Sequence, residues 1–81
     1  MWHVYIVECS DGSYYTGITN NLNRRLSQHN SKTGAKSIRG KLPIKLVYGE
    51  VVESKNLALK RENEIKGWRR EKKINLIKGL P

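Results

Sequence analysis

The stretch VYIVECSDGSYYTG, residues 4–17, carries two tyrosines, Tyr5 and Tyr15, and ends in Gly17. A phenol transfers a proton only when its hydroxyl is held beside the reacting group. A glycine next to such a ring leaves room that a larger side chain would fill. What this stretch can do chemically therefore depends on whether both rings lie on one face of the local structure.

Residues 2–8 and 14–18 are rich in β-branched and aromatic types and predict two strands joined by a three-residue loop that ends in glycine. This odd loop length pairs Tyr5 with Gly17 and places Tyr15 diagonally beside Tyr5 on the same face. A two-residue turn would put the two tyrosines on opposite faces. We expect Gly17 to leave open space over the ring of Tyr5.

Residues 21–30, NLNRRLSQHN, predict a helix, with Asn20 or Asn21 as its N-cap. Arg25 and His29 are four residues apart, so they share a stripe of this helix. The alternative is an ordinary exposed helix face.

A longer helix is expected over 55–69, and Glu62 lies at the edge of its apolar stripe. A carboxylate there is costly unless it is paired or bound to a metal. The alternative to a metal ligand is a surface ion pair between Glu62 and Lys66, four residues on. The expected stripe consists of Leu57, Ala58, Ile65 and Trp68.

Two phenols, a guanidinium, an imidazole and one carboxylate suit the cleavage of a phosphodiester. One carboxylate holds a hard cation that polarises a phosphoryl oxygen. A guanidinium neutralises the charge that develops on phosphorus, and a phenol or imidazole takes a proton from water. The same residues form no Ser-His-Asp triad, no glycosidase carboxylate pair and no Walker-type glycine loop.

The chain has 81 residues, so we expect one domain, 1–81, with a site that lies open on the surface. Its net charge of +9 and pI near 10.0 favour nucleic acid, most simply DNA, as the partner. The alternative is a solvated basic surface. The cations expected to follow a phosphate backbone are Arg24, Lys32, Lys36, Arg39 and Lys41.

Cys9 is the only cysteine, so an internal disulfide and a cysteine-based zinc cluster are both excluded. The start, MWHVYIVEC, lacks the basic and long apolar parts of a signal peptide, and no run approaches the length of a membrane span. We expect a cytoplasmic protein without a membrane contact or a small-molecule cofactor.

The order strand, strand, helix, strand, helix, helix predicts a small α+β domain, with a three-stranded, largely antiparallel sheet flanked by helices. The third strand is expected at 44–52, with a bulge at Gly49, and the last helix at 71–78.

The spacing of these residues resembles that of a GIY-YIG nuclease domain. The pattern is VY and YTG with their tyrosines, Tyr5 and Tyr15, ten positions apart, Arg25 and His29 ten and fourteen positions after Tyr15, and ALKRE ending in Glu62. The runs DGSYYTGITNNLNRRLSQHN and GAKSIRGKLPIKLVY are similar to the small stand-alone bacterial group of YazA and YhbQ type. The resemblance covers roughly residues 2–78.

This resemblance implies roles for four of the residues. Tyr5 would act as general base or orient the attacking water, and Tyr15 would bind the phosphate or help position that water. Arg25 would stabilise the transition state, and His29 would assist proton transfer or contact the phosphate.

The resemblance also implies that Glu62 holds a single Mg²⁺ or Mn²⁺, weakly without substrate, and that Gly17 keeps the hairpin surface open. Because a free phenol has a pKa of about 10, Tyr5 is a poor base unless its anion is favoured. The charges of Arg25 and of a metal would supply that bias.

Two tripeptides depart from the family pattern. The first reads His3-Val4-Tyr5 where the family usually has Gly-Ile-Tyr, and the second reads Tyr15-Thr16-Gly17, with Thr in place of Ile. Both tripeptides keep their tyrosine. We therefore expect a metal-dependent endonuclease that hydrolyses DNA, with repair or recombination as its expected setting. The alternative is a nucleic-acid-binding module with little or no catalysis on the same scaffold.

Overall fold

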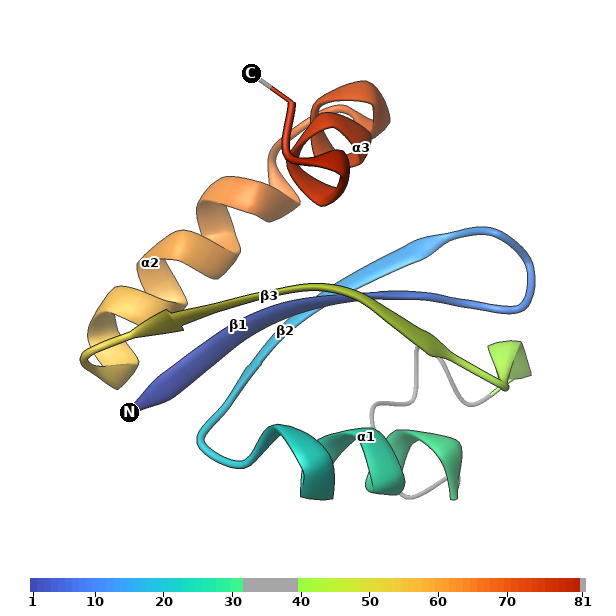
Figure 1. Cartoon of the computed structure of the whole chain (residues 1–81), viewed down its shortest axis with the longest axis horizontal. Helices are drawn as coiled ribbons and strands as arrows, with labels where there is room; N and C mark the ends of the chain where they lie inside the picture. The colour runs from blue at the N-terminus through green and yellow to red at the C-terminus, as the bar shows by residue number, and fades with distance from the viewer. Residues whose placement is uncertain (32–39, 81) are drawn as a thin grey trace.

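A computed structural model describes residues 1–31 and 40–80. Three antiparallel strands form one sheet in the order β2-β1-β3, and α1 lies on one side of it while α2 and α3 lie on the other (Figure 1). The expected α+β class is confirmed. The elements are β1 (Trp2–Glu8), β2 (Tyr14–Thr19), α1 (Leu22–Asn30), β3 (Lys45–Val52), α2 (Lys55–Lys66) and α3 (Arg70–Lys78).

The hairpin between β1 and β2 has the predicted three-residue loop. The Cys9 N–H donates to the Ser13 carbonyl (2.8 Å), and Gly12 takes the left-handed backbone conformation with φ at +83°. Tyr5 consequently pairs with Gly17, as the loop length predicted. This register fixes which side chains of the two strands share a face.

The two faces of β1 serve different purposes. Val4 and Ile6 are fully buried against Ala58 and Ile65 of α2, and these four residues form the apolar core. Because side chains alternate along a strand, Tyr5 points to the opposite face, toward α1. The core thus anchors β1 from one side and leaves its other side to the polar cluster.

The bulge in β3 lies at Val47 and not at Gly49, so that expectation is wrong. Ile6 pairs with Tyr48 and the next residue of β1 pairs with Leu46, which leaves Val47 as the extra residue. Gly49 stays in the regular ladder, opposite Tyr5. Tyr5 therefore has a glycine beside it on both neighbouring strands.

Helix α2 is shorter than predicted and contacts the sheet along a narrow line. It ends at Lys66, where the Gly67 N–H donates to the carbonyls of the last turn. Ala58 and Ile65 define the contact line, and Leu57, a quarter-turn away, is 49% exposed rather than buried. Glu62 lies just beside this line, which explains its partial burial.

None of the described helices is long and apolar enough to cross a membrane.

Candidate active site

The centre of the site is a hydrogen bond between the side chains of Tyr5 and His29. The Tyr5 hydroxyl lies 2.8 Å from Nε2 of His29, and both residues are buried, at 0% and 1% exposed. Tyr5 comes from the middle of β1 and His29 from the last turn of α1. This bond therefore joins the sheet to the helix that packs beneath it.

Burial keeps both partners of this bond neutral near pH 7. It raises the pKa of Tyr5, and the charges of Tyr15 and Glu62 add to the rise, whereas a hydrogen bond from Arg25 opposes it. Burial, followed by the Arg25 charge, lowers the pKa of His29. With both groups neutral, the phenol donates to Nε2 when the imidazole proton is on Nδ1, and the direction is reversed in the other tautomer. Arg25 favours the Tyr5 anion, as expected, but burial outweighs this effect and the pKa of Tyr5 is raised overall.

Tyr15 completes an aromatic cluster with these two residues. Its ring centroid lies 6.5 Å from that of Tyr5 and 5.5 Å from that of His29, the latter in an edge-to-face arrangement. Tyr15 is half-buried, unlike the other two. It is thus the ring of the cluster that a substrate can reach from solvent.

Gly17 accommodates the ring of Tyr5, and the space above it is not open as expected. A Cβ at this position would lie 2.6 Å from Oη and 2.7 Å from Cζ of Tyr5, and 3.1 Å from Cε1 of Tyr15. No other residue type fits there without moving a ring. At Gly49, on the other side of Tyr5, a Cβ would meet nothing within 4 Å.

Arg25 lies beside the cluster and is half-buried on α1. Its Nη1 donates to the Gln28 side chain (3.3 Å), and its charge acts on the pKa of both Tyr5 and His29. The helix that carries it begins at Asn21, whose side chain accepts from the Arg24 N–H (3.1 Å). The cap thus fixes the start of the helix that supplies Arg25 and His29.

Glu62 approaches the site from α2. Its side chain is only 14% exposed, and its carboxylate pairs with the Lys66 ammonium at 3.3 Å. The ion pair named as the alternative is therefore present. The same carboxylate is close enough to raise the pKa of Tyr5, after the effect of burial. Glu62 consequently lies within electrostatic range of the phenol cluster.

A divalent metal would find one protein carboxylate here. The described residues contain no group of three or more His, Cys, Asp or Glu side chains that could hold a metal ion. Mg²⁺ commonly binds through one or two carboxylates and completes its shell with water and substrate phosphate. Glu62 fits that mode, provided that Lys66 gives up its ion pair when the metal binds.

The site is more closed than the sequence suggested. Tyr5, Gly17 and His29 are buried, while Tyr15, Arg25 and Glu62 are partly exposed around them. The closure arises because the missing side chain at Gly17 lets the end of the Tyr5 ring occupy the space that a Cβ would fill. A phosphate would meet the partly exposed rim before it reached the Tyr5 hydroxyl.

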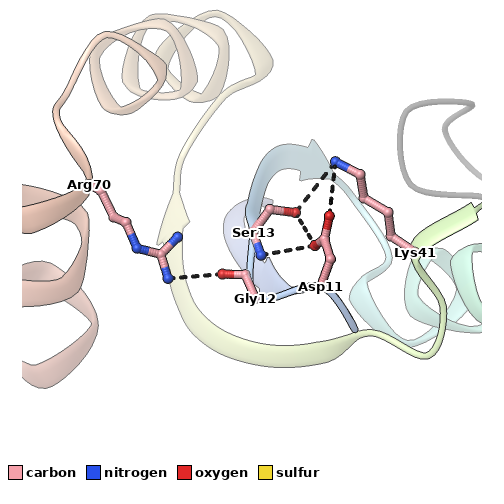
Figure 2. A network of polar contacts seen from close by, with 5 residues as sticks. All are labelled: Asp11, Gly12, Ser13, Lys41 and Arg70. Atoms are coloured by element: carbon pink, nitrogen blue, oxygen red, sulfur yellow. Dashed lines mark hydrogen bonds and ion pairs between the residues drawn. The ribbon is translucent and has the colours of Figure 1, made fainter.

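Lys41, expected to follow a phosphate backbone, is held at the tip of the hairpin instead (Figure 2). Its ammonium pairs with the Asp11 carboxylate at 3.6 Å and donates to the Ser13 hydroxyl at 3.5 Å. Hydrogen bonds from Ser13, together with the Lys41 charge, hold the pKa of Asp11 below its usual range. Lys41 is thus partly neutralised by its own hairpin.

The other cations expected to bind nucleic acid have different positions. Arg24 is exposed on α1. The remaining three, Lys32, Lys36 and Arg39, lie outside the described residues.

Sequence reasoning missed a second contact at the hairpin tip. Arg70, the first residue of α3, donates from Nη2 to the Gly12 carbonyl (2.9 Å) and lies 4.6 Å above the ring of Tyr14 (Figure 2). The two residues are 58 positions apart in the sequence. The only sequence signal for Arg70 is the basic segment that contains it, and this segment does not indicate which residue Arg70 contacts.

Comparison with known protein families gives a match to the GIY-YIG catalytic domain over residues 1–75. The chain belongs to the GIY-YIG family. The family is of nuclease type, and the match covers all six residues singled out by their spacing. Membership therefore agrees with the aromatic cluster and with the carboxylate on α2.

Similar proteins include small bacterial members of the same kind. The UPF0213 protein SAV0488 of Staphylococcus aureus strain Mu50 is 53% identical over 75 residues, 93% of this chain and 92% of that protein. The solution structure of the UPF0213 protein BH0048 from Bacillus halodurans is 44% identical, with a TM-score of 0.62, and the match covers 96% of this chain and 84% of that one. The solution structure of the protein EF2693 from E. faecalis is 37% identical, with a TM-score of 0.65 and coverage of 95% and 82%.

Proposed function

We propose that this GIY-YIG protein is a divalent-metal-dependent endonuclease that hydrolyses phosphodiester bonds in DNA. The observation that carries the proposal is the 2.8 Å hydrogen bond between Tyr5 and His29, buried among Tyr15, Gly17 and Arg25. A buried phenol needs a hydrogen-bond partner in any fold, but here the partner is an imidazole with a guanidinium nearby. Such a pairing of a phenol with a neutral imidazole suits proton transfer.

The hydrogen bond gives a route for the proton. The Tyr5 hydroxyl donates its proton to Nε2 of His29 and, through a lone pair, accepts a proton from the attacking water. His29 then carries the positive charge, and the hydroxide attacks phosphorus as the bond to the leaving oxygen breaks. The leaving oxygen departs as an alkoxide and takes a proton from solvent water. This route avoids a free Tyr5 phenolate, which burial disfavours. Burial and the Arg25 charge also disfavour the His29 imidazolium that it forms, so the negative charge of the bound phosphate would have to stabilise that cation.

The remaining residues act on the charge of the phosphate. Arg25 stabilises the negative charge that develops on the phosphoryl oxygens. Tyr15, the partly exposed ring, contacts the phosphate and admits water to Tyr5. Glu62 would hold Mg²⁺ or Mn²⁺, which neutralises charge on a phosphoryl oxygen. Lys66 is then free to pair with a neighbouring phosphate.

The test is cleavage of supercoiled, nicked, branched and single-stranded DNA by the purified chain with Mg²⁺ or Mn²⁺. We expect metal-dependent cutting that a Glu62→Gln variant loses by at least 100-fold. The matched control is Glu64→Gln on the same helix, because Glu64 is exposed and pairs with Arg61. Absence of cutting in every substrate, or equal cutting by Glu62→Gln, would refute the proposal.

A second candidate is a nucleic-acid-binding module that hardly turns over. It is favoured by the ion pair of Glu62 with Lys66 and by the burial of Tyr5, which together close the site in this state. Binding measured without metal separates the two candidates. Tight, salt-sensitive binding that Tyr5→Phe and Glu62→Ala leave unchanged, without cleavage, would favour the binding module.

A further inference from the structure

A second hollow lies away from the tyrosine cluster, at α3. It has a volume of about 200 Å³ and is lined by Trp68, Lys72, Asn75, Leu76 and Leu80. Because α3 and α1 lie on opposite sides of the sheet (Figure 1), this hollow is separate from the hydrogen bond between Tyr5 and His29.

The end of α3 forms the rim of the hollow. Gly79 takes the left-handed conformation with φ at +72°, and the Leu80 N–H donates back to the Asn75 carbonyl at 2.8 Å. This is a Schellman-type ending, which folds the residue after the glycine back over the helix. Leu80 is consequently held at the hollow although it is 55% exposed.

Trp68 and Lys72 give the hollow a flat aromatic wall and a positive charge. The Lys72 ammonium lies 4.3 Å from the centroid of the Trp68 ring. Arg61, also near this ring at 5.2 Å, is committed to ion pairs with acids of β3 and α2. Lys72 forms no ion pair within the part of the chain that the structure describes.

The surroundings of the hollow are strongly basic. Residues 66–78 contain a single acid, Glu71. Such a surface attracts a polyanion and repels other basic surfaces. The cations of this segment are Lys66, Arg69, Arg70, Lys72, Lys73 and Lys78.

We propose that this hollow binds one unpaired nucleotide of a single-stranded nucleic-acid segment. The base stacks on Trp68 between Leu76 and Leu80, the Asn75 amide contacts the edge of the base, and Lys72 binds the adjoining phosphate. Stacking on an aromatic ring beside a cation is the usual means of binding single strands without sequence preference. The proposal rests on the proposed function for its substrate class, and it places an anchoring site away from the bond that is cut.

Lys72 does not block such a base. Trp68 is half-buried, and a lysine over such a ring contributes about 0.5–2 kcal/mol, whereas the stacking of a base on an aromatic side chain contributes about 1–3 kcal/mol. A base that enters the hollow therefore displaces the ammonium, which then lies free to meet a phosphate.

Tryptophan fluorescence tests this proposal without metal, so that no cleavage is involved. In a Trp2→Phe variant, Trp68 is the only tryptophan. We expect oligothymidylate to quench its emission, and an oligomer with the same phosphates but abasic sugars to bind about tenfold more weakly without quenching. Lys72→Gln should weaken binding of oligothymidylate at least fivefold more than the charge-matched control Lys60→Gln, an exposed residue of α2.

Equal binding of the normal and abasic oligomers, or unchanged Trp68 emission at saturation, would overturn the proposal. Quenching by an acidic peptide and not by oligothymidylate would assign the hollow to a protein partner and overturn it as well. These outcomes are independent of the nuclease assay, since DNA cutting without quenching leaves the proposed function intact, and quenching without cutting leaves the anchoring site intact.

Discussion

His29 is the residue whose ionisation most directly reports the state of the cluster. Within residues 1–31 and 40–80, its neighbours include Tyr5, Tyr15 and Arg25, and none of these three carries a carboxylate that would favour an imidazolium. Burial, together with the Arg25 charge, lowers the pKa of His29, so the folded protein resists protonation there. The aromatic cluster is therefore an acid-sensitive part of the fold.

Stability should fall as the pH drops below about 6.5, because the unfolded chain then protonates this imidazole while the folded chain does not. The loss continues until the pH reaches the lowered pKa of His29, at no more than about 1.4 kcal/mol per pH unit. Urea unfolding between pH 7.5 and 5 measures it. A His29→Gln variant should lose this slope and His3→Gln should keep it; an identical slope in all three proteins would contradict the assignment.

Gly17 and Gly49 offer a matched pair, since they flank Tyr5 on β2 and β3. Gly17→Ala should cost about 1–3 kcal/mol of stability and disrupt the cluster, because its Cβ would meet the Tyr5 hydroxyl. Gly49→Ala should change stability by less than about 1 kcal/mol, because its Cβ meets nothing. Chemical denaturation measures both. Equal losses of stability in the two variants would show that the Tyr5 ring does not require a glycine at position 17 in particular.

At this scale the sequence predicted the identity of the clustered residues better than their environment. The odd loop length placed Tyr5 and Tyr15 on one face, since side-chain alternation follows directly from register. It did not predict that Tyr5 is fully buried or that its hydroxyl meets His29. Those facts depend on how closely α1 packs under the sheet, which no spacing within one segment encodes.

At the scale of elements, α1 supplies two side chains to the site yet is only nine residues long. Its Asn21 cap should therefore matter for both its formation and its position. Asn21→Ala is expected to cost about 1 kcal/mol and to lower DNA cleavage. Ser54→Ala, which removes the equivalent cap of α2, should cost a similar amount.

The readout that separates the two caps is the environment of His29. Its imidazole signals in a proton–nitrogen NMR spectrum should shift in Asn21→Ala and stay in place in Ser54→Ala. The reverse pattern would mean that α1 is positioned by other contacts.

The elements themselves were largely predictable because short periodic segments with caps and turns encode them locally. The hairpin and the Asn21 N-cap follow such rules, whereas the order β2-β1-β3 within the sheet was not predicted. The length of α2 and the position of the bulge in β3 were not predicted correctly from local sequence. The helix stops at Gly67 and turns to bring Trp68 and α3 onto the sheet, which is a tertiary effect.

At the scale of the whole molecule, the net charge of +9 predicts binding that depends steeply on salt. If about six phosphates are contacted, log K should fall with log salt at a slope of about −5. Fluorescence anisotropy of a labelled duplex from 50 to 300 mM salt measures it. A slope near zero would mean that the basic surface does not contact the phosphate backbone.

The measurement that tests the central claim most directly is a double-mutant cycle in single-turnover DNA cleavage with Mg²⁺. If Tyr5 and His29 move one proton together, Tyr5→Phe and His29→Gln should each lower the rate by about 10²–10⁴-fold, and the double variant should be no slower than the worse single variant. The proteins should remain folded by circular dichroism. A rate loss in the double variant equal to the product of the two single losses would contradict a shared proton route through this hydrogen bond. A wild-type rate in either single variant would contradict it as well.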